Sequence, residues 1–400
     1  MAERHGRIEM KINGKIKNGF CKRLAVIVAA IVAAVCCYTF LQVDRQPLME
    51  NEGRSFVKAQ VASILEDNEQ LEGVYVGDQR VQLTILSGAH QGESVEATSS
   101  SAYLYGVHCT EGMKVVAILS ESRGEIVASV YGYNREPVIY LMVGLFLLTI
   151  WLIGGKQGIY SIFGLAFTFL CIFFFFLPMI YRGFSPVAAA VIVVIASTLV
   201  TMYLVAGVSV KGTAAVIGTI MGVLVAGIIA FVFGKLGHVT GYNVSDIENL
   251  IYVQEQVGIQ VGELLFAGIL ISALGAVMDV SMSIASTLQE LHDKNPAMGG
   301  RQLFRSGMTV GRDMMGTMSN TLILAFAGGS INTLVLFYAY AYSYTQMINM
   351  YDIGIEIIQG LSASLGVVLT VPFVSGIAAW MIAHAAAKEQ KAAKTESGKF

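Results

Sequence analysis

Eight runs of predominantly apolar residues constrain this 400-residue chain more than any other feature. A bilayer hydrocarbon core about 30 Å thick needs roughly 20 apolar residues to be crossed by a helix. The chain is 55% hydrophobic and only 14% charged, which is unusual for a soluble domain. We therefore expect a mainly α-helical polytopic protein of the lipid bilayer, with spans at about 24–41, 138–153, 159–180, 187–206, 212–233, 261–286, 314–340 and 361–384.

The distribution of basic residues predicts the orientation of these spans. If the N-terminus is cytoplasmic, 17 of the 26 Lys and Arg residues lie inside, seven lie in the long outer segment, and only Arg182 and Lys235 lie in short outer loops. This agrees with the positive-inside rule, which discounts long outer segments. We expect eight spans with both chain ends inside. The first run is expected to be an uncleaved anchor, because no small-x-small cleavage site follows it.

The predicted spans divide the chain into five parts. Between the first and second span lies the only stretch that could fold in water, with short β-branched runs such as "RVQLTIL" and "EIVASVYGY" separated by turn residues, a pattern typical of antiparallel strands. The expected parts are a basic cytoplasmic N-terminus (1–23), a membrane anchor (24–41), an extracytoplasmic β-rich, barrel-like domain (42–136), a seven-helix membrane domain (137–385) and a basic cytoplasmic tail (386–400).

Composition also excludes several classes of function. A net charge of −2 provides no basic field for nucleic acid. The five cysteines are scattered without disulfide or metal spacing, and His90 and His108 have no nearby ligand partners in the sequence. We expect no metal, no cofactor and no enzyme activity, because motifs such as H-E-x-x-H and G-x-S-x-G are missing. No Walker A sequence is present either, so nucleotide-driven transport would need a separate subunit.

Two polar edges distinguish the last three spans from the earlier, nearly uncharged ones. On a helix, residues three or four apart share a face. In the sixth span such spacing joins Ser272, Gly275, Asp279, Ser283, Ser286 and Glu290. In the seventh it joins Asp313, Gly316, Thr317 and Asn320, followed by Thr321. Because neighbouring spans run antiparallel, we expect the two edges to face each other across a path for an ion or solute.

Asp279 is the costliest member of these edges. An aspartate at the centre of a span costs roughly 2.5–3.5 kcal/mol on insertion scales, against about 0.3–0.6 kcal/mol gained by each Leu or Ile. Two interpretations stay open from the sequence. The carboxyl either binds an ion or proton, as intramembrane acids often do, or it forms a structural hydrogen bond between helices.

The residues at the start and within the last spans also allow two interpretations. Asp313 is either part of the path or the N-cap of its helix, and the neighbouring Arg312 is expected to anchor the span at the inner membrane surface. Glu356 is expected at the membrane interface. The run "AFAGGSINT" and Pro372 indicate either breaks within the seventh and eighth spans, of the kind that recur at transporter midplanes, or ordinary kinks in long, tilted helices.

Three long blocks resemble a known family: "LLFAGILISALGAVMDVSMSIASTLQEL", "SGMTVGRDMMGTMSNTLILAFAGGS" and "EIIQGLSASLGVVLTVPFVSGIAA". They resemble the YibE/F-like family of bacterial multi-pass membrane proteins. The resemblance implies a polytopic protein of the bacterial plasma membrane, and it supplies no reaction. The residues that match family-typical positions are Asp279, Glu290, Pro296, Gly307, Gly311, Arg312, Asp313, Thr317, Asn320, Thr321 and Pro372.

The favoured function is a secondary transporter or permease of a small solute or ion. Its path is expected to use Asp279, Ser283, Asp313, Thr317 and Asn320, supported by Ser272, Ser286, Glu290, Arg312, Thr321 and Pro372. The alternative is a non-catalytic envelope scaffold or sensor that acts through its outer β-domain. The sequence allows a homo-oligomer or a partner membrane subunit and does not choose between them.

Overall fold

The computed structural model describes residues 53–67, 69–71, 74–75, 77–100, 107–122, 125–244 and 246–397, together with Ala25, Val26 and Val28. The basic N-terminus, most of the anchor at 24–41 and the last three residues lie outside this part of the chain. The chain divides into two compact units, one comprising Arg45–Ile150 and the other comprising Met1–Asp44 and Trp151–Phe400. Each unit is described by itself.

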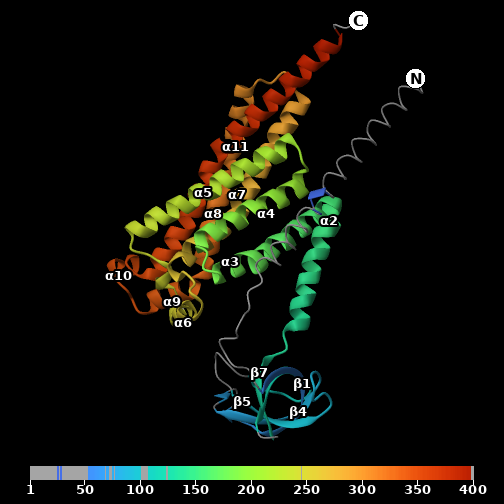
Figure 1. Ribbon diagram of the computed structural model, residues 1–400. Coiled ribbons are helices and arrows are strands. Elements are labelled where there is room, and N and C mark those ends of the chain that lie inside the picture. The colour runs from blue at the N-terminus through green and yellow to red at the C-terminus, as the bar shows by residue number, and fades with distance from the viewer. Residues whose placement is uncertain are drawn as a thin grey trace, which may run out of the picture. The chain divides into compact units, whose positions relative to one another are not determined.

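Five strands of the first unit close into a barrel in the order β1-β4-β5-β7-β6 (Figure 1). Alternate residues of each strand fill its interior, as strand geometry requires; β4, for example, buries Gln79, Val81, Leu83 and Ile85. The strands are β1 (Arg54–Glu66), β4 (Asp78–Ile85), β5 (Ser94–Ser100), β6 (Lys114–Ser122) and β7 (Glu125–Tyr133), and a separate two-stranded sheet is formed by β2 (Glu69–Leu71) and β3 (Val74–Tyr75).

One strand pair departs from the antiparallel pattern expected from the sequence. β5 and β7 run parallel, whereas the other neighbours in the barrel are antiparallel and β1 closes it against β6. A five-stranded Greek-key barrel with this strand order and one parallel pair has the topology of an OB-fold. Short alternating runs indicate strands, but they do not indicate which strands become neighbours.

The second unit is a bundle of long helices, in which α11 packs against α5, α7 and α8 (Figure 1). Its α4 packs on α5 and α7. The helical elements, which begin in the first unit, are α2 (Glu136–Cys171), η1 (Ile172–Phe176), α3 (Leu177–Tyr181), α4 (Pro186–Ala206), α5 (Val210–Leu236), η2 (Gly241–Asn243), α6 (Ile247–Val257), α7 (Val261–Lys294), α8 (Gly300–Gly329), α9 (Ile331–Ala339), α10 (Tyr344–Ile348) and α11 (Tyr351–Ser397).

Glycines bring α11 into close contact with the helices on either side of it. A Cβ atom at Gly222 of α5 would overlap the hydroxyl of Thr370, and one at Gly311 of α8 would overlap Val371. At Gly307 a Cβ would lie 2.6 Å from the Oγ of Ser375. Gly307 and Gly311 form a G-x-x-x-G spacing, which permits backbones to approach in membrane helices. These glycines therefore allow α5 and α8 to pack closely against α11.

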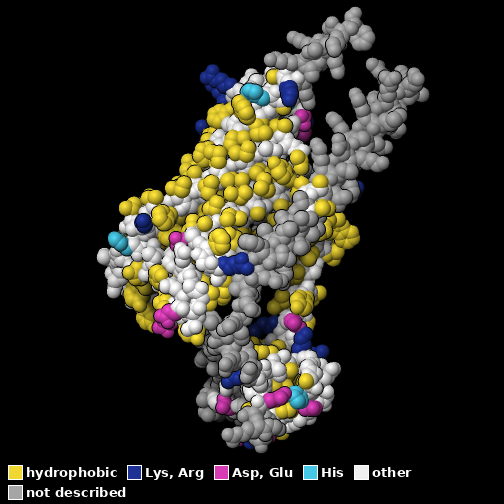
Figure 2. Space-filling view, in the orientation of Figure 1, with side chains coloured by type: hydrophobic (Ala, Val, Ile, Leu, Met, Phe, Trp, Pro, Cys, Tyr) yellow, Lys and Arg dark blue, Asp and Glu magenta, His cyan; other side chains and the backbone are white. Residues whose placement is uncertain are grey.

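Five helical segments among the described residues are long and apolar enough to cross a membrane. They are Glu136–Tyr181, Pro186–Ala206, Val210–Leu236, Val261–Lys294 and Tyr351–Lys388, and α8 with α9 counts as a sixth if this pair, bent by 62°, is one broken span. Apolar side chains are spread widely over the visible helical surface (Figure 2). The chain is thus a helical polytopic protein, while the eight-span arrangement stays a prediction.

One difference from the predicted spans has a clear backbone cause. The spans expected at 138–153 and 159–180 are not separated by a loop, and a single kinked residue, Gly155, lies between their helices. Its φ is 52° and its ψ is −130°, a conformation that glycine adopts and other residues do not. The break expected near "AFAGGSINT" is present, and it lies at Ser330 between α8 and α9. The break expected at Pro372 is not, because α11 continues through this residue as one helix.

The alternative that Asp313 caps a helix is wrong. α8 begins at Gly300, with Gly299 as its N-cap, and Gly299 donates its N–H to the Oε1 of Gln302 at 3.3 Å. Asp313 and Arg312 consequently lie well inside α8. The charged first half of this helix resembles a loop in sequence, but it is held as helix by packing of Leu303, Gly307 and Gly311, and tertiary packing commonly overrides such local patterns.

Candidate functional site

Asp279 lies beside a cavity of about 450 Å³ between α2, α4 and α7. α7 contributes the polar edge predicted from the sequence, since Ser272, Gly275 and Asp279 all line this cavity. The opposite face of α7 is apolar and packs in the bundle core, including Val277, Val280 and Ile284. Because the helix has 3.6 residues per turn, the polar edge lies on the cavity and the apolar face packs α7 into the bundle core.

The other walls supply hydroxyl groups from helices that carry almost no charge. Thr168 of α2 donates from its Oγ1 to the carbonyl of Gly164 at 3.0 Å and lies 2.7 Å from the Oγ of Ser197. Thr201 of α4 donates to the same carbonyl at 3.4 Å. Ser161 also lines the cavity, and its Oγ donates to Gln157. These hydroxyl oxygens retain acceptor capacity, because each hydroxyl has two lone pairs and only one proton.

Close approach of α2 and α4 shapes this side of the cavity. A Cβ at Gly164 would lie 2.9 Å from Cγ2 of Thr201, so glycine is needed for the two helices to meet here. The side-chain amide of Gln157 adds a bond to the carbonyl of Val205 at 2.6 Å. The wall opposite Asp279 is thus fixed by one small residue and one interhelical hydrogen bond.

The Asp279 carboxylate receives no hydrogen bond and forms no ion pair within the part of the chain that the structure describes. Two other carboxylates of this unit have partners: Glu263 accepts a hydrogen bond from Ser185, and Glu290 pairs with Lys294 at 3.1 Å. A carboxylate in a candidate span is costly unless a positive group or a proton compensates its charge. Asp279 is therefore the carboxylate available to a ligand on this cavity.

The second predicted edge does not line the same cavity. Asp313, Gly316, Thr317 and Asn320 are exposed on α8. The hydroxyl of Thr317 donates to the carbonyl of Met314 at 2.9 Å, and that of Thr321 donates to the carbonyl of Thr317 at 2.9 Å. α8 turns its glycine face, and not this edge, towards α11. The structure thus assembles Asp279 with residues of α2 and α4, where the sequence analysis expected residues of α8.

The remaining residues named from the sequence fall into different surroundings. Ser283 and Ser286 are half-buried on α7, Arg312 is exposed on α8, and Pro372 lies inside α11 next to Val371, which contacts Gly311. Ser161, Thr168 and Thr201 were missed, because their spans looked like apolar scaffold. A sign of them was present: Ser161 and Thr168 are seven residues apart and therefore share a helix face.

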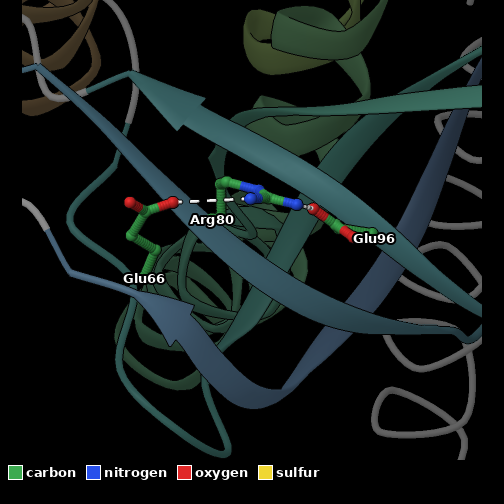
Figure 3. A network of polar contacts seen from close by, with 3 residues as sticks. All are labelled: Glu66, Arg80 and Glu96. Carbon is green, nitrogen blue, oxygen red and sulfur yellow. Dashed lines mark hydrogen bonds and ion pairs between the residues drawn. The ribbon is translucent and has the colours of Figure 1, made fainter.

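The barrel carries charged clusters on its surface. Figure 3 shows Arg80 of β4 between Glu96 of β5 and Glu66 of β1; its Nε donates to Glu96 at 2.6 Å and its Nη1 lies 3.5 Å from Glu66. The hydrogen bond and charge of Glu96 raise the pKa of Arg80 above its ordinary value. No group of three or more His, Cys, Asp or Glu residues suited to a metal ion occurs among the residues described here.

His90 is held between two carboxylates. Its Nδ1 lies 3.0 Å from Glu93 and its Nε2 lies 2.8 Å from Glu121. The hydrogen bond to Glu121, with further effects from Glu93, raises the pKa of His90. Both ring nitrogens can donate only in the imidazolium form, so the geometry favours a protonated histidine.

Comparison with known proteins identifies the family of the chain. A family model described as YibE/F-like protein matches residues 142–384, which include α4 to α9 and all the residues lining the Asp279 cavity. No curated protein and no solved structure matches the chain. Because the match covers more than half of the sequence, the chain belongs to the YibE/F-like protein family.

Proposed function

We propose that the protein is a secondary transporter or permease of a small solute or ion, and that Asp279 is its binding carboxylate. The observation that supports this most directly is the unpartnered Asp279 carboxylate beside a cavity of about 450 Å³. Polar and ionisable residues inside membrane segments are rare because they are costly, and they commonly mark ion pathways.

The chemistry of the lining favours a cation or a proton as the species bound at Asp279. The carboxylate supplies one negative charge, and the hydroxyls of Ser161, Thr168, Thr201 and Ser272 supply neutral oxygen atoms. Protonation of Asp279 would cancel the charge that holds a cation. Loading and release could therefore be coupled to proton exchange at one side chain, without a nucleotide.

The topology that accompanies this proposal has eight spans with both ends in the cytoplasm of a bacterial cell, and the barrel on the outer side of the plasma membrane. The positive-inside distribution of Lys and Arg supports it. The helical stretch Glu136–Tyr181, interrupted at Gly155, would then supply two of the eight spans.

Flux through proteoliposomes tests the assignment. The purified chain and its variants would be reconstituted at equal density and assayed with Na⁺, K⁺, Mg²⁺ and proton gradients. Asp279→Asn should abolish flux of the transported ion, and Thr168→Val with Thr201→Val should weaken it. Asp313→Asn is the matched control, because Asp313 is a carboxylate of another helix and does not line this cavity. Undiminished flux in Asp279→Asn would refute the site.

A second candidate function is a non-catalytic envelope scaffold or sensor, and the barrel supports it. OB-folds commonly bind ligands on the face of their second and third strands, which are β4 and β5 here, and Arg80 and Glu96 lie on these strands. Replacing residues 54–133 by a flexible linker should abolish function on this hypothesis while Asp279→Asn leaves it intact. The reverse result would support transport.

The exposed polar edge of α8 supports a further proposal, that this helix is covered by a second copy or by a partner membrane subunit. Thr317, Asn320 and Thr321 are exposed in a segment that counts as a broken span together with α9, and polar side chains often join membrane helices. A cysteine at position 320 should then form cross-links between copies, or to the partner, at a higher yield than one at the lipid-type position 324. Equal yields would contradict the proposal.

A further inference from the structure

A second cavity lies at the bend between α8 and α9. Ser330 ends α8 and begins α9, and the two helices differ in direction by 62°. The cavity has a volume of about 430 Å³, and residues of α8, α9 and α11 line it together with Ser330. These residues are Ile323, Phe326, Ala327, Leu334, Ile353, Glu356, Ile357, Gly360 and Leu361.

Glu356 is the only charged residue that lines this cavity among the residues that the structure describes. Its Oε1 accepts a hydrogen bond from the hydroxyl of Ser330 at 2.6 Å. Its Oε2 is buried and has no hydrogen-bond partner among the described residues. A buried carboxylate oxygen without a partner is costly, so this atom is one that a ligand or a proton would satisfy.

The carboxylate sets the charge preference at this place, because the helix ends oppose each other there. α8 ends at Gly329 and α9 begins at Ile331, so the partial negative charge of one helix end lies beside the partial positive charge of the other. The Glu356 carboxylate therefore favours a positive group, and it would repel an anionic ligand.

The walls determine what kind of cation fits. Apart from Glu356 and Ser330 the lining side chains are apolar, and a small metal ion would find a single carboxylate where it needs several oxygen ligands. An aromatic ring, Phe326, is also present and lies against Gly360, where a Cβ would be 3.4 Å from its Cδ2. Aromatic faces attract organic cations, and apolar walls with few polar groups are typical of sites for organic ligands.

We propose that this cavity binds an organic ammonium ion with an apolar body, with Glu356 as its counter-ion and Ser330 as the positioning residue. The ammonium group would contact the Oε2 of Glu356, and the apolar body would fill the space between α8, α9 and α11. The site is separate from the Asp279 cavity, which α2, α4 and α7 line. It does not depend on the transport proposal.

Equilibrium binding to the full chain in lipid nanodiscs tests the proposal, with 2-phenylethylammonium as the probe and the uncharged 2-phenylethanol for comparison. The wild-type chain should bind the ammonium more tightly than the alcohol. Glu356→Gln should lower the affinity for the ammonium by about tenfold or more and leave that for the alcohol unchanged. Ser330→Ala should cause a smaller loss, and Glu356→Asp should recover part of the binding.

Two controls separate this site from global effects and from Asp279. Asp352→Asn removes another carboxylate from the first turn of α11, where Asp352 is exposed, and it should bind both probes as the wild type does. Asp279→Asn should also bind normally even if it abolishes transport. The proposal is overturned if the wild-type chain does not bind the ammonium at millimolar concentration, binds both probes equally, or binds as before in Glu356→Gln.

Discussion

The barrel and the helical bundle differ in whether their charged side chains have partners. On the barrel, Arg80 lies between two glutamates, His90 contacts two more, and Lys58 pairs with Glu136. In the bundle, Asp279 has no partner within the described residues, and one oxygen of Glu356 is buried without one. The barrel thus pairs these charges with one another, whereas the bundle leaves these two carboxylates open in segments where burying a charge is costly.

The two units also differ in how their interiors are held together. Strand pairing and a buried amide stabilise the barrel, while close contacts at glycines position the helices. Membrane helices gain little from the hydrophobic effect in lipid and depend on close packing. The stability of the bundle should therefore depend on its glycines, and its function on its unpartnered carboxylates.

The largest effect is expected at a glycine contact of the bundle. Gly311→Val would force a side chain into Val371 of α11 and should destabilise the bundle by about 3 kcal/mol, as overpacking does. Gly316→Val is the matched control on the same helix, because nothing lies within 4 Å of its Cβ position. Thermal unfolding in detergent measures both, and equal melting temperatures would contradict the packing role of Gly311.

A buried amide of the barrel should give the next largest effect. Gln79 accepts the N–H of Cys109 at 2.8 Å and donates to its carbonyl at 3.0 Å. Gln79→Leu would leave both backbone groups buried without partners and should destabilise the barrel by about 2 kcal/mol. Hydrogen exchange of the segment 107–110 would report the loss. Gln82→Leu, a half-buried position on the same strand, should leave that exchange unchanged.

Asp279→Asn should have the opposite effect on stability. Because no described residue pairs with this carboxylate, its removal should stabilise the bundle by about 1 kcal/mol, as is common when a functional charge is neutralised. The melting temperature of the reconstituted protein measures the change. A clear drop would show that Asp279 has a structural role and would support the helix-to-helix interpretation.

The smallest effect is expected from His90, and it should depend on pH. Its pKa is raised above the usual 6.5, chiefly by the hydrogen bond to Glu121. The stabilisation is therefore fully present below pH 6.5 and is lost as the pH rises through the folded-state pKa. Hydrogen exchange in the loop 86–93 should be slower at low pH after correction for intrinsic rates, and His90→Gln should remove this difference. A difference that persists in the variant would assign it to another group.

The helical spacing of the polar residues and the insertion cost of Asp279 predicted part of the candidate site. The edge of Ser272, Gly275 and Asp279 follows from helical spacing alone, and the structure shows these residues on one side of α7. The partners of that edge could not be predicted, because spacing within one helix does not specify which neighbour it faces. Thr168 and Thr201 are single hydroxyls in apolar runs, and only the packing of α2, α4 and α7 makes them lining residues.

The fold was predictable where local patterns agree with tertiary structure. β-branched alternation indicated strands in the barrel, and apolar length indicated α4, α5, α7 and α11. α8 was predicted to start too late, because Arg301, Arg305 and Arg312 make its first half polar. Its glycine face determines that this half is helical. The burial of one Glu356 oxygen depends on the bend at Ser330, which sequence composition indicates only as a break.

The interruption at Gly155 bears on whether the number of membrane crossings in the chain is odd or even. A helix rises 1.5 Å per residue, so the 46 residues of Glu136–Tyr181 would extend about 69 Å if straight, more than twice the thickness of the hydrocarbon core. If the interruption at Gly155 lets this stretch cross twice, the barrel lies on the same side of the membrane as the loop after Tyr181; if it crosses once, they lie on opposite sides. The side of the membrane that we propose for the barrel therefore depends on one backbone conformation, that of Gly155.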